Sequence, residues 1–105
     1  MSDEPQVSRV VDLVSYQSGA VVSRIVVKRD AGNVTLFAFD AGQELSEHTA
    51  PYDALVQVVD GEAAITVAGR PYRLGTGEMI LMPARTPHAL RAASRFKMLL
   101  TMIRS

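Results

Sequence analysis

Apolar and polar positions alternate in the middle of the chain. Ala63, Ile65 and Val67 share one parity, and Ala64 and Thr66 fill the positions between them. A period of two is typical of a strand, because successive side chains of a strand point to opposite faces of the sheet. This segment therefore predicts a strand that buries one face and leaves the other outside.

Other segments combine β-branched residues with turn signals at their ends. Val21–Arg29 and residues 34–39 flank the turn-forming residues 30–33, which predicts a β-hairpin. Alternation over residues 96–103 favours another strand, although Met and Leu also permit a helix over residues 94–104. Residues 7–14 fit either a strand or a short helix. The chain is therefore expected to be mostly β.

Short clusters of Gly, Pro, Asp and Asn interrupt the chain every 8–12 residues or so. They occur at residues 18–19, 30–33, 40–42, 60–61, 69–71, 75–77 and 83–87. Strands stop at such residues because Pro lacks a backbone donor and Gly supplies unusual backbone angles. This spacing predicts a barrel or sandwich of short strands.

Composition limits the class of protein. The 105 residues suit a single domain over residues 1–105, and a hydrophobic fraction of 48% supplies a core. Eleven basic and eleven acidic residues cancel, so neither nucleic acid nor an anionic membrane surface is an expected partner. Absence of cysteine excludes thiolate chemistry. No apolar run approaches about 18 residues, and an acidic, polar start makes the cytoplasm the expected location.

Two histidines are the main candidates for chemistry. His48 and His88 each lie where a turn meets a predicted strand. Neutral imidazole is a good ligand for divalent transition metals such as Zn, Mn, Fe, Ni and Cu, and it also exchanges protons near neutral pH. The two residues are therefore candidates for metal binding, ligand binding or acid–base chemistry.

The spacing around these histidines resembles the two motifs of the cupin superfamily. Gly42, five residues, His48, twelve residues and Gly61 are similar to the first motif, at about residues 42–61. Gly77, five residues, a proline and then His88 are similar to the second, at about residues 77–92. The resemblance implies a single jelly-roll β-barrel, commonly dimeric, with a ligand site inside the barrel mouth. It also implies that the two histidines converge on one pocket.

The chain departs from the motifs at the metal ligands. The family's metal is usually held by three histidines and one glutamate, and here Ala50 and Ala54 occupy one histidine position and the glutamate position. Arg85 replaces a glycine and Ala92 an asparagine of the second motif. Glu44 would lie about 13 Å from His48 along an extended strand. A divalent transition metal is therefore expected to be held weakly, if it is bound at all, by the two remaining histidines.

The resemblance also suggests which other residues lie near the pocket. Tyr52 and Arg85 fall at loop positions near the barrel mouth, where Arg85 could hold a carboxylate. Apolar side chains are expected to surround the histidines, which favours the neutral form of imidazole. Four methionines are interpreted as core residues that fill irregular space. These are Met79, Met82, Met98 and Met102.

Three functions fit these residues. The first is a module that binds a small molecule through His48 and His88 without turnover, with or without a weakly held divalent metal. The second is a metal-dependent enzyme of the oxygenase or isomerase class with a sparse ligand set. The third is a structural barrel that forms a homodimer and keeps a vestigial pocket. The two alanines favour the first or third function, and the two retained histidines favour the first or second.

Overall fold

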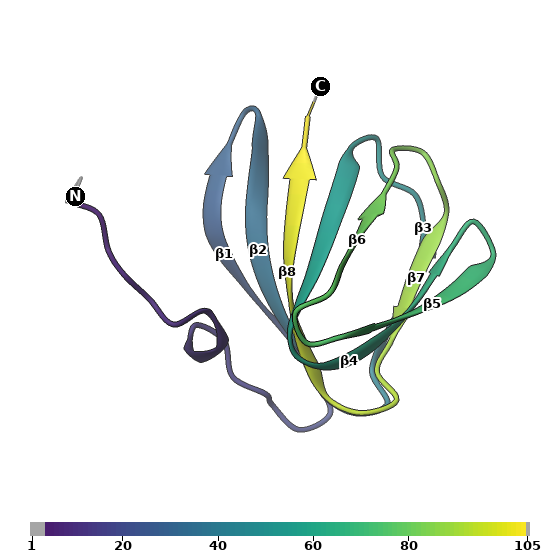
Figure 1. Ribbon diagram of the computed structural model, residues 1–105, viewed down its shortest axis with the longest axis horizontal. Coiled ribbons are helices and arrows are strands. Elements are labelled where there is room, and N and C mark those ends of the chain that lie inside the picture. The colour runs from purple at the N-terminus through teal and green to yellow at the C-terminus, as the bar shows by residue number, and fades with distance from the viewer. Residues whose placement is uncertain (1–3, 105) are drawn as a thin grey trace.

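The computed structural model describes residues 4–104, and its regular structure is almost entirely strand (Figure 1). Within that range the only helical turn is the 3₁₀ turn η1 (Val10–Asp12). The strands are β1 (Val21–Arg29), β2 (Gly32–Phe39), β3 (Glu44–His48), β4 (Asp53–Val67), β5 (Arg70–Gly75), β6 (Met79–Met82), β7 (His88–Arg91) and β8 (Phe96–Ile103). The all-β expectation is confirmed, and residues 94–104 contain a strand rather than a helix.

The strands form one curled antiparallel sheet. Its order is β1-β2-β8-β4-β7-β3, and β5 and β6 also pair with β4. Figure 1 shows the sheet folding back on itself, so that β8 and β6 face β3 and β7 across the interior. Within residues 4–104 no ladder joins β1 to β3, so the barrel is a half-closed jelly roll.

The long strand β4 connects the two halves of the curl. Residues 53–61 pair with β8, and residues 62–67 pair with β5. The first half ends at Gly61, which has a φ of 78°, and a Cβ placed there would lie 2.4 Å from the Arg95 carbonyl oxygen. Only glycine tolerates this bend. The turn predicted at residues 60–61 is therefore wrong, because the strand bends here and continues.

The core lies on the concave side of the curl. Alternate residues of β4 are buried there, and the alternation predicted for residues 63–67 is confirmed, since Ala63, Ile65 and Val67 are buried and the residues between them are not. Phe39 stacks on Phe96 at 4.6 Å between ring centroids. A fully buried aromatic side chain contributes most to a core of this size.

The segment before β1 packs against the convex side of the sheet. Val14 is buried there with Leu36 and Ala38. Tyr16 donates a hydrogen bond to Asp60 at 2.5 Å, and the Arg95 guanidinium carbon lies 4.6 Å from the centre of its ring. These contacts bind the N-terminal segment to the outside of the barrel.

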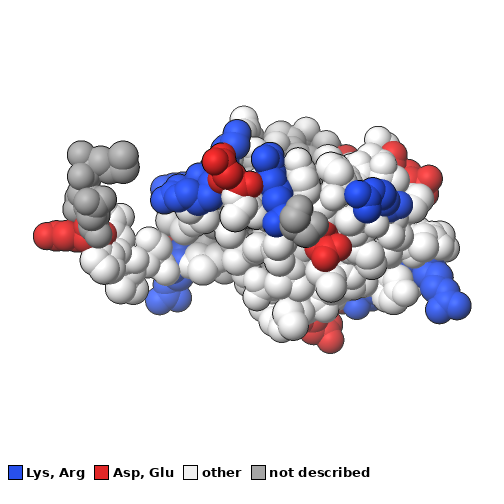
Figure 2. Space-filling model, turned by 90° about the horizontal axis from the view of Figure 1, so that it is seen from above, with Lys and Arg blue, Asp and Glu red and all other residues white. Residues whose placement is uncertain are grey.

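Charges of both signs are distributed over the surface. On the face that Figure 2 shows, basic and acidic side chains are interspersed rather than separated by sign. This face offers no basic stripe of the kind that nucleic acids require. No helix among residues 4–104 is long and apolar enough to cross a membrane.

Candidate functional site

A β-bulge in β3 positions the first histidine. In the ladder between β3 and β7, Leu45 is opposite Leu90 and His48 is opposite His88. Three steps along β3 thus match two steps along β7, which is one extra residue. The extra residue puts His48 on the same face as Leu45, and both line one cavity. A regular alternation along β3 would put His48 on the same face as Glu44, and the bulge breaks that alternation.

The two histidines meet as a cross-strand pair, here called the imidazole pair. Their Nε2 atoms are 3.1 Å apart, and the rings meet edge to face with centroids 4.3 Å apart. His88 is buried, with 5% of its surface exposed, whereas His48 is exposed. The predicted convergence of these two residues on one pocket is confirmed. The pair extends from the solvent to the interior.

Backbone carbonyls fix the tautomer of each ring. Nδ1 of His48 lies 2.8 Å from the carbonyl oxygen of Ser46, and Nδ1 of His88 lies 3.1 Å from that of Thr86. A carbonyl oxygen only accepts, so each Nδ1 carries a proton and donates it. In the neutral rings both Nε2 atoms therefore present lone pairs to each other. These two lone pairs are satisfied only when a proton, a hydrogen-bond donor or a metal ion lies between or beside the Nε2 atoms.

His88 accepts such a proton less readily than an ordinary histidine does. Burial lowers the pKa of His88, and the positive charge of a protonated His48 lowers it further, while the bond to the Thr86 carbonyl opposes these effects. Nε2 of His88, 3.1 Å from Nε2 of His48, is therefore suited to accept a hydrogen bond rather than to carry a proton itself. His88 remains a neutral acceptor at the edge of the cavity.

The cavity behind the pair is small and apolar. Its volume is about 70 Å³, which exceeds the about 10–15 Å³ that a cavity needs to hold one water. The wall contains two histidines, two alanines and six larger apolar residues. The residues lining it are Leu45, His48, Ala50, Ala54, Met82, His88, Leu90, Met98, Leu100 and Met102.

Several residues of this wall were not expected beside the histidines. The sequence assigned Met98 and Met102 to the core, and they are also cavity residues that face the imidazole pair. Alternation along β8 showed that Met98 and Met102 share a face. Nothing in the local sequence indicates which residues lie opposite that face across the interior. Met79 is 65% exposed, so its assignment to the core is wrong.

Neither Tyr52 nor Arg85 lines this cavity. Tyr52 is half-buried, and the Arg104 guanidinium carbon lies 4.9 Å from the centre of its ring. Arg85 is exposed, with a φ of 61°, and its N–H donates to the Ala50 carbonyl at 2.7 Å. A left-handed φ explains why the motif has glycine at this position. The Arg85 backbone thus holds the loop after β6 against Ala50.

The described residues do not form the four-ligand metal site of the family pattern. No cluster of three or more His, Cys, Asp or Glu that could hold a metal exists within residues 4–104. The carboxylates nearest in sequence do not line this cavity. Asp53 accepts a hydrogen bond from the Ala84 N–H at 2.9 Å. Glu44 and Glu47 line a second hollow. Two imidazoles alone fall short of the three protein ligands that catalytic zinc usually has.

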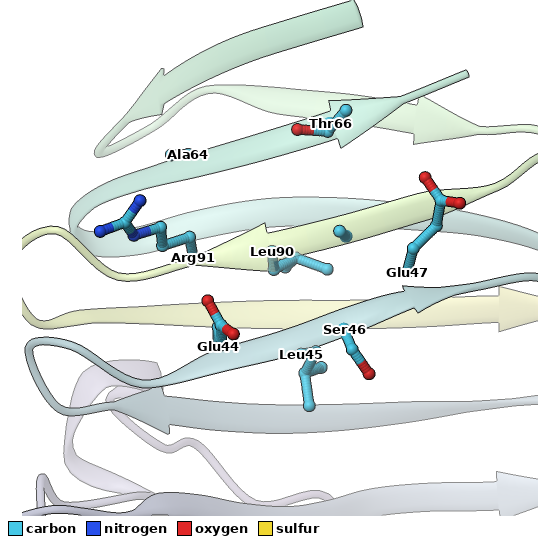
Figure 3. A pocket seen from close by; sticks show the side chains of 9 residues that line it. Glu44, Leu45, Ser46, Glu47, Ala64, Thr66, Leu90 and Arg91 are labelled. Carbon is cyan, nitrogen blue, oxygen red and sulfur yellow. The ribbon is translucent and has the colours of Figure 1, made fainter. Parts of the chain in front are cut away.

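That second hollow lies on the convex side of β3, β7 and β4, as Figure 3 shows. Its volume is about 420 Å³. Glu44 and Arg91 lie at one end, and Glu47 and Thr66 at the other. The carboxylates that could have completed a metal site therefore belong to the opposite side of the sheet from the imidazole pair.

Known structures share this arrangement of strands. The chain is 36% identical to a conserved protein of unknown function from Streptococcus pyogenes, with a TM-score of 0.91 and coverage of 99% of this chain and 91% of that one. It is 39% identical to a cupin 2 conserved barrel domain protein from Leptotrichia buccalis, with a TM-score of 0.87 and coverage of 90% and 46%. No curated protein sequence matches this chain significantly.

A more distant neighbour is an enzyme. A DMSP lyase from Ruegeria pomeroyi has a TM-score of 0.74, with 22% identity and coverage of 81% of this chain and 47% of that one, which shows a shared fold. The family model described as a cupin domain matches residues 35–104, a range that includes both histidines and all strands from β3 onward. With both motif histidines meeting inside the curled sheet, the chain belongs to the cupin family.

Proposed function

We propose that this cupin binds a compact small molecule in the cavity beside the imidazole pair, without turnover. The observation that supports the proposal is the convergence of two Nε2 atoms, 3.1 Å apart, at the edge of an enclosed apolar space. Few convergent polar groups on an otherwise apolar wall are typical of small-molecule sites. Apart from the two imidazoles, the wall offers side chains that carry no nucleophile or carboxylate, so binding is favoured over chemistry.

The cavity limits the ligand's size and polarity. A volume of about 70 Å³ is far below the about 300–1,000 Å³ of drug-sized sites. Because each Nδ1 donates to a backbone carbonyl, the pair offers Nε2 to the ligand, so a hydroxyl or N–H group suits it. The ligand's remaining atoms must be few and apolar. Tyr52 and Arg85 stay predicted contacts only for a ligand that extends beyond the cavity.

A titration with compact probes tests this proposal. Small alcohols, amides and azoles are added to the purified protein, and binding is followed by NMR at the histidine ring nitrogens. We expect saturable shifts at the Nε2 atoms. The variant Ala54→Leu fills the cavity and should abolish them, whereas Ala64→Leu, on the convex side of the same strand, should not. Equal responses in the two variants would contradict the proposal.

Two alternative functions make different predictions. The cupin fold accommodates enzymes, as the lyase neighbour illustrates, so a metal-dependent oxygenase or isomerase remains the second candidate. It requires a stoichiometric divalent metal in untagged protein that is lost in a His48→Ala, His88→Ala double variant. The structural alternative requires that no probe binds at all. Elemental analysis and the probe titration together separate the three functions.

We also propose that the protein forms a homodimer through the edge strand β1. Among residues 4–104 this strand pairs with β2 alone, so within that range its other edge presents backbone donors and acceptors without a strand partner. Ile25 is 61% exposed on it and Val26 47%. A second copy of the same edge can pair antiparallel about a two-fold axis. Light scattering should give a dimer mass that Val26→Pro converts to a monomer mass; a monomeric parent protein would contradict this.

The cytoplasmic location and the exclusion of nucleic acid and membrane partners stay predictions of the sequence.

A further inference from the structure

Sulfur atoms share the cavity with the imidazole pair. Met82, Met98 and Met102 all line it. Met82 and Met98 are buried and Met102 is half-buried. Thioether sulfur is a soft, polarizable donor that favours soft metal ions, whereas carboxylate oxygen favours hard ones. The cavity therefore combines two borderline nitrogen donors with soft sulfur and with no oxygen donor from a side chain.

Strand register places two of these thioethers around one alanine. Ala54 of β4 is opposite Met82 of β6 on one side and opposite Met102 of β8 on the other. Residues directly opposite in an antiparallel sheet have Cβ atoms about 4.5–5.5 Å apart. Ala54 occupies the position where the motif has its glutamate, so its short side chain leaves space between two methionines. Two methionine side chains thus flank the position where a hard carboxylate would otherwise lie.

The imidazole pair has a spacing that suits a bent pair of ligands. Its Nε2 atoms are 3.1 Å apart, so an ion at the usual metal–nitrogen distance of about 2.0–2.1 Å would subtend an N–metal–N angle of about 100°. In the neutral rings both Nε2 lone pairs are available to an ion, because the Nδ1 protons are donated to the Ser46 and Thr86 carbonyls. A bent pair occupies two neighbouring positions around an ion and leaves the others open.

The charge of the site distinguishes between metal ions. All its donors are neutral in the tautomers described above, and no Asp or Glu within residues 4–104 lines the cavity. The cost of moving an ion from water into apolar surroundings rises with its charge, so a divalent ion without a carboxylate is strongly disfavoured. We infer that the cavity is a Cu(I) site, held by the imidazole pair and by the two thioethers beside Ala54. The site shares its cavity with the proposed small molecule but does not depend on that function.

Anaerobic titration of the full-length protein with Cu(I), against bicinchoninate as a competing chelator, tests the inference. We expect one Cu(I) per chain, bound about 100-fold or more tighter than Zn(II) or Mn(II). The double variant Met82→Leu, Met102→Leu keeps an apolar wall of similar volume and removes both sulfur atoms. It should weaken Cu(I) binding about tenfold or more. The matched control is Met79→Leu, an exposed methionine at the start of β6, and it should bind like the parent protein.

Three results would overturn the inference: unchanged Cu(I) affinity in the double variant, Zn(II) or Mn(II) binding as tight as Cu(I), or Cu(I) binding that survives His48→Gln, His88→Gln. If circular dichroism shows that the double variant is unfolded, the half-buried Met102→Leu carries the same test alone. The organic probes separate this inference from the proposed function. Probe binding without Cu(I) binding overturns the copper site only, and Cu(I) binding without probe binding overturns the small-molecule function only.

Discussion

The concave and convex sides of β3, β7 and β4 carry different chemistry on the same three strands. The concave side presents the imidazole pair and apolar residues around a cavity of about 70 Å³. The convex side presents Glu44, Glu47 and Arg91 around an open hollow of about 420 Å³ (Figure 3). Carboxylates that lie within a few residues of His48 are thus unavailable to it. Strand faces, rather than distance along the chain, decide which residues form a site.

The largest effect should come from placing the same polar group on the two sides of β4. Ile65→Asn puts an amide at a position that is 1% exposed and removes core volume, which should cost about 3–5 kcal/mol of unfolding free energy. Thr66→Asn, on the convex side, should change it by less than about 1 kcal/mol. Urea unfolding measures both. Similar losses would contradict the assignment of the two faces.

A carboxylate moved to the concave side should create a divalent site. Ala54→Glu gives the imidazole pair a third donor, and we expect Zn(II) affinity to rise about 100-fold, which corresponds to about 2.7 kcal/mol. Ala64→Glu, on the convex side of the same strand, should leave Zn(II) affinity unchanged. Calorimetric titration of both variants gives the comparison. Equal gains would mean that surface carboxylates, and not the cavity, bind the ion.

The pH dependence of the unfolding free energy should show that the imidazole of His88 is buried. Since burial lowers the pKa of His88, the unfolded chain takes up its proton at a higher pH than the folded chain does. Stability contributed by this group is complete above the ordinary histidine pKa and falls as the pH drops toward the lowered value. The variant His88→Asn should flatten this part of the stability profile. Urea unfolding between pH 5 and pH 8 measures the unfolding free energy of both proteins. If its slope against pH is the same in the variant, His88 is not the group responsible.

The smallest effect should follow removal of the extra residue in β3. Deleting Glu47 converts the bulge into a regular ladder that still pairs Leu45 with Leu90 and His48 with His88. The imidazole pair should persist, with a loss of about 1 kcal/mol or so of unfolding free energy from the altered twist. NMR coupling between the two rings and urea unfolding measure the outcome. Separation of the rings would show that the bulge itself holds them together.

Local patterns predicted the strands well, and the family resemblance predicted the meeting of the histidines. Alternation identified the buried parity of residues 63–67 because one face of a strand is uniformly apolar there. Two features of β3 and β4 escaped it. The bulge before His48 is one unpaired residue with no distinctive side chain, and the bend at Gly61 uses a residue that equally marks a turn. Both depend on partners distant in sequence.

The cavity wall escaped prediction for the same reason. Met82 and Met102 come from strands that flank β4 on opposite sides, and nothing local to either methionine indicates the alanine between them. Ala54 was recognised as a missing ligand, but its neighbours follow only from register. Pairing between strands therefore decides which side chains surround Ala54, the position that lacks its metal ligand.

The bend in β4 has a mechanical consequence for the cavity. Residues 54–58 carry the neighbours of the thioethers, residues 64–67 carry the neighbours of His88, and Gly61 lies between these two stretches. One continuous strand therefore connects the methionine side of the cavity with the histidine side. Its curvature at Gly61 sets the distance between these two sides. Since only glycine fits at this bend, the spacing of the two walls is fixed by the backbone, and a bound molecule would enter a cavity that is already formed.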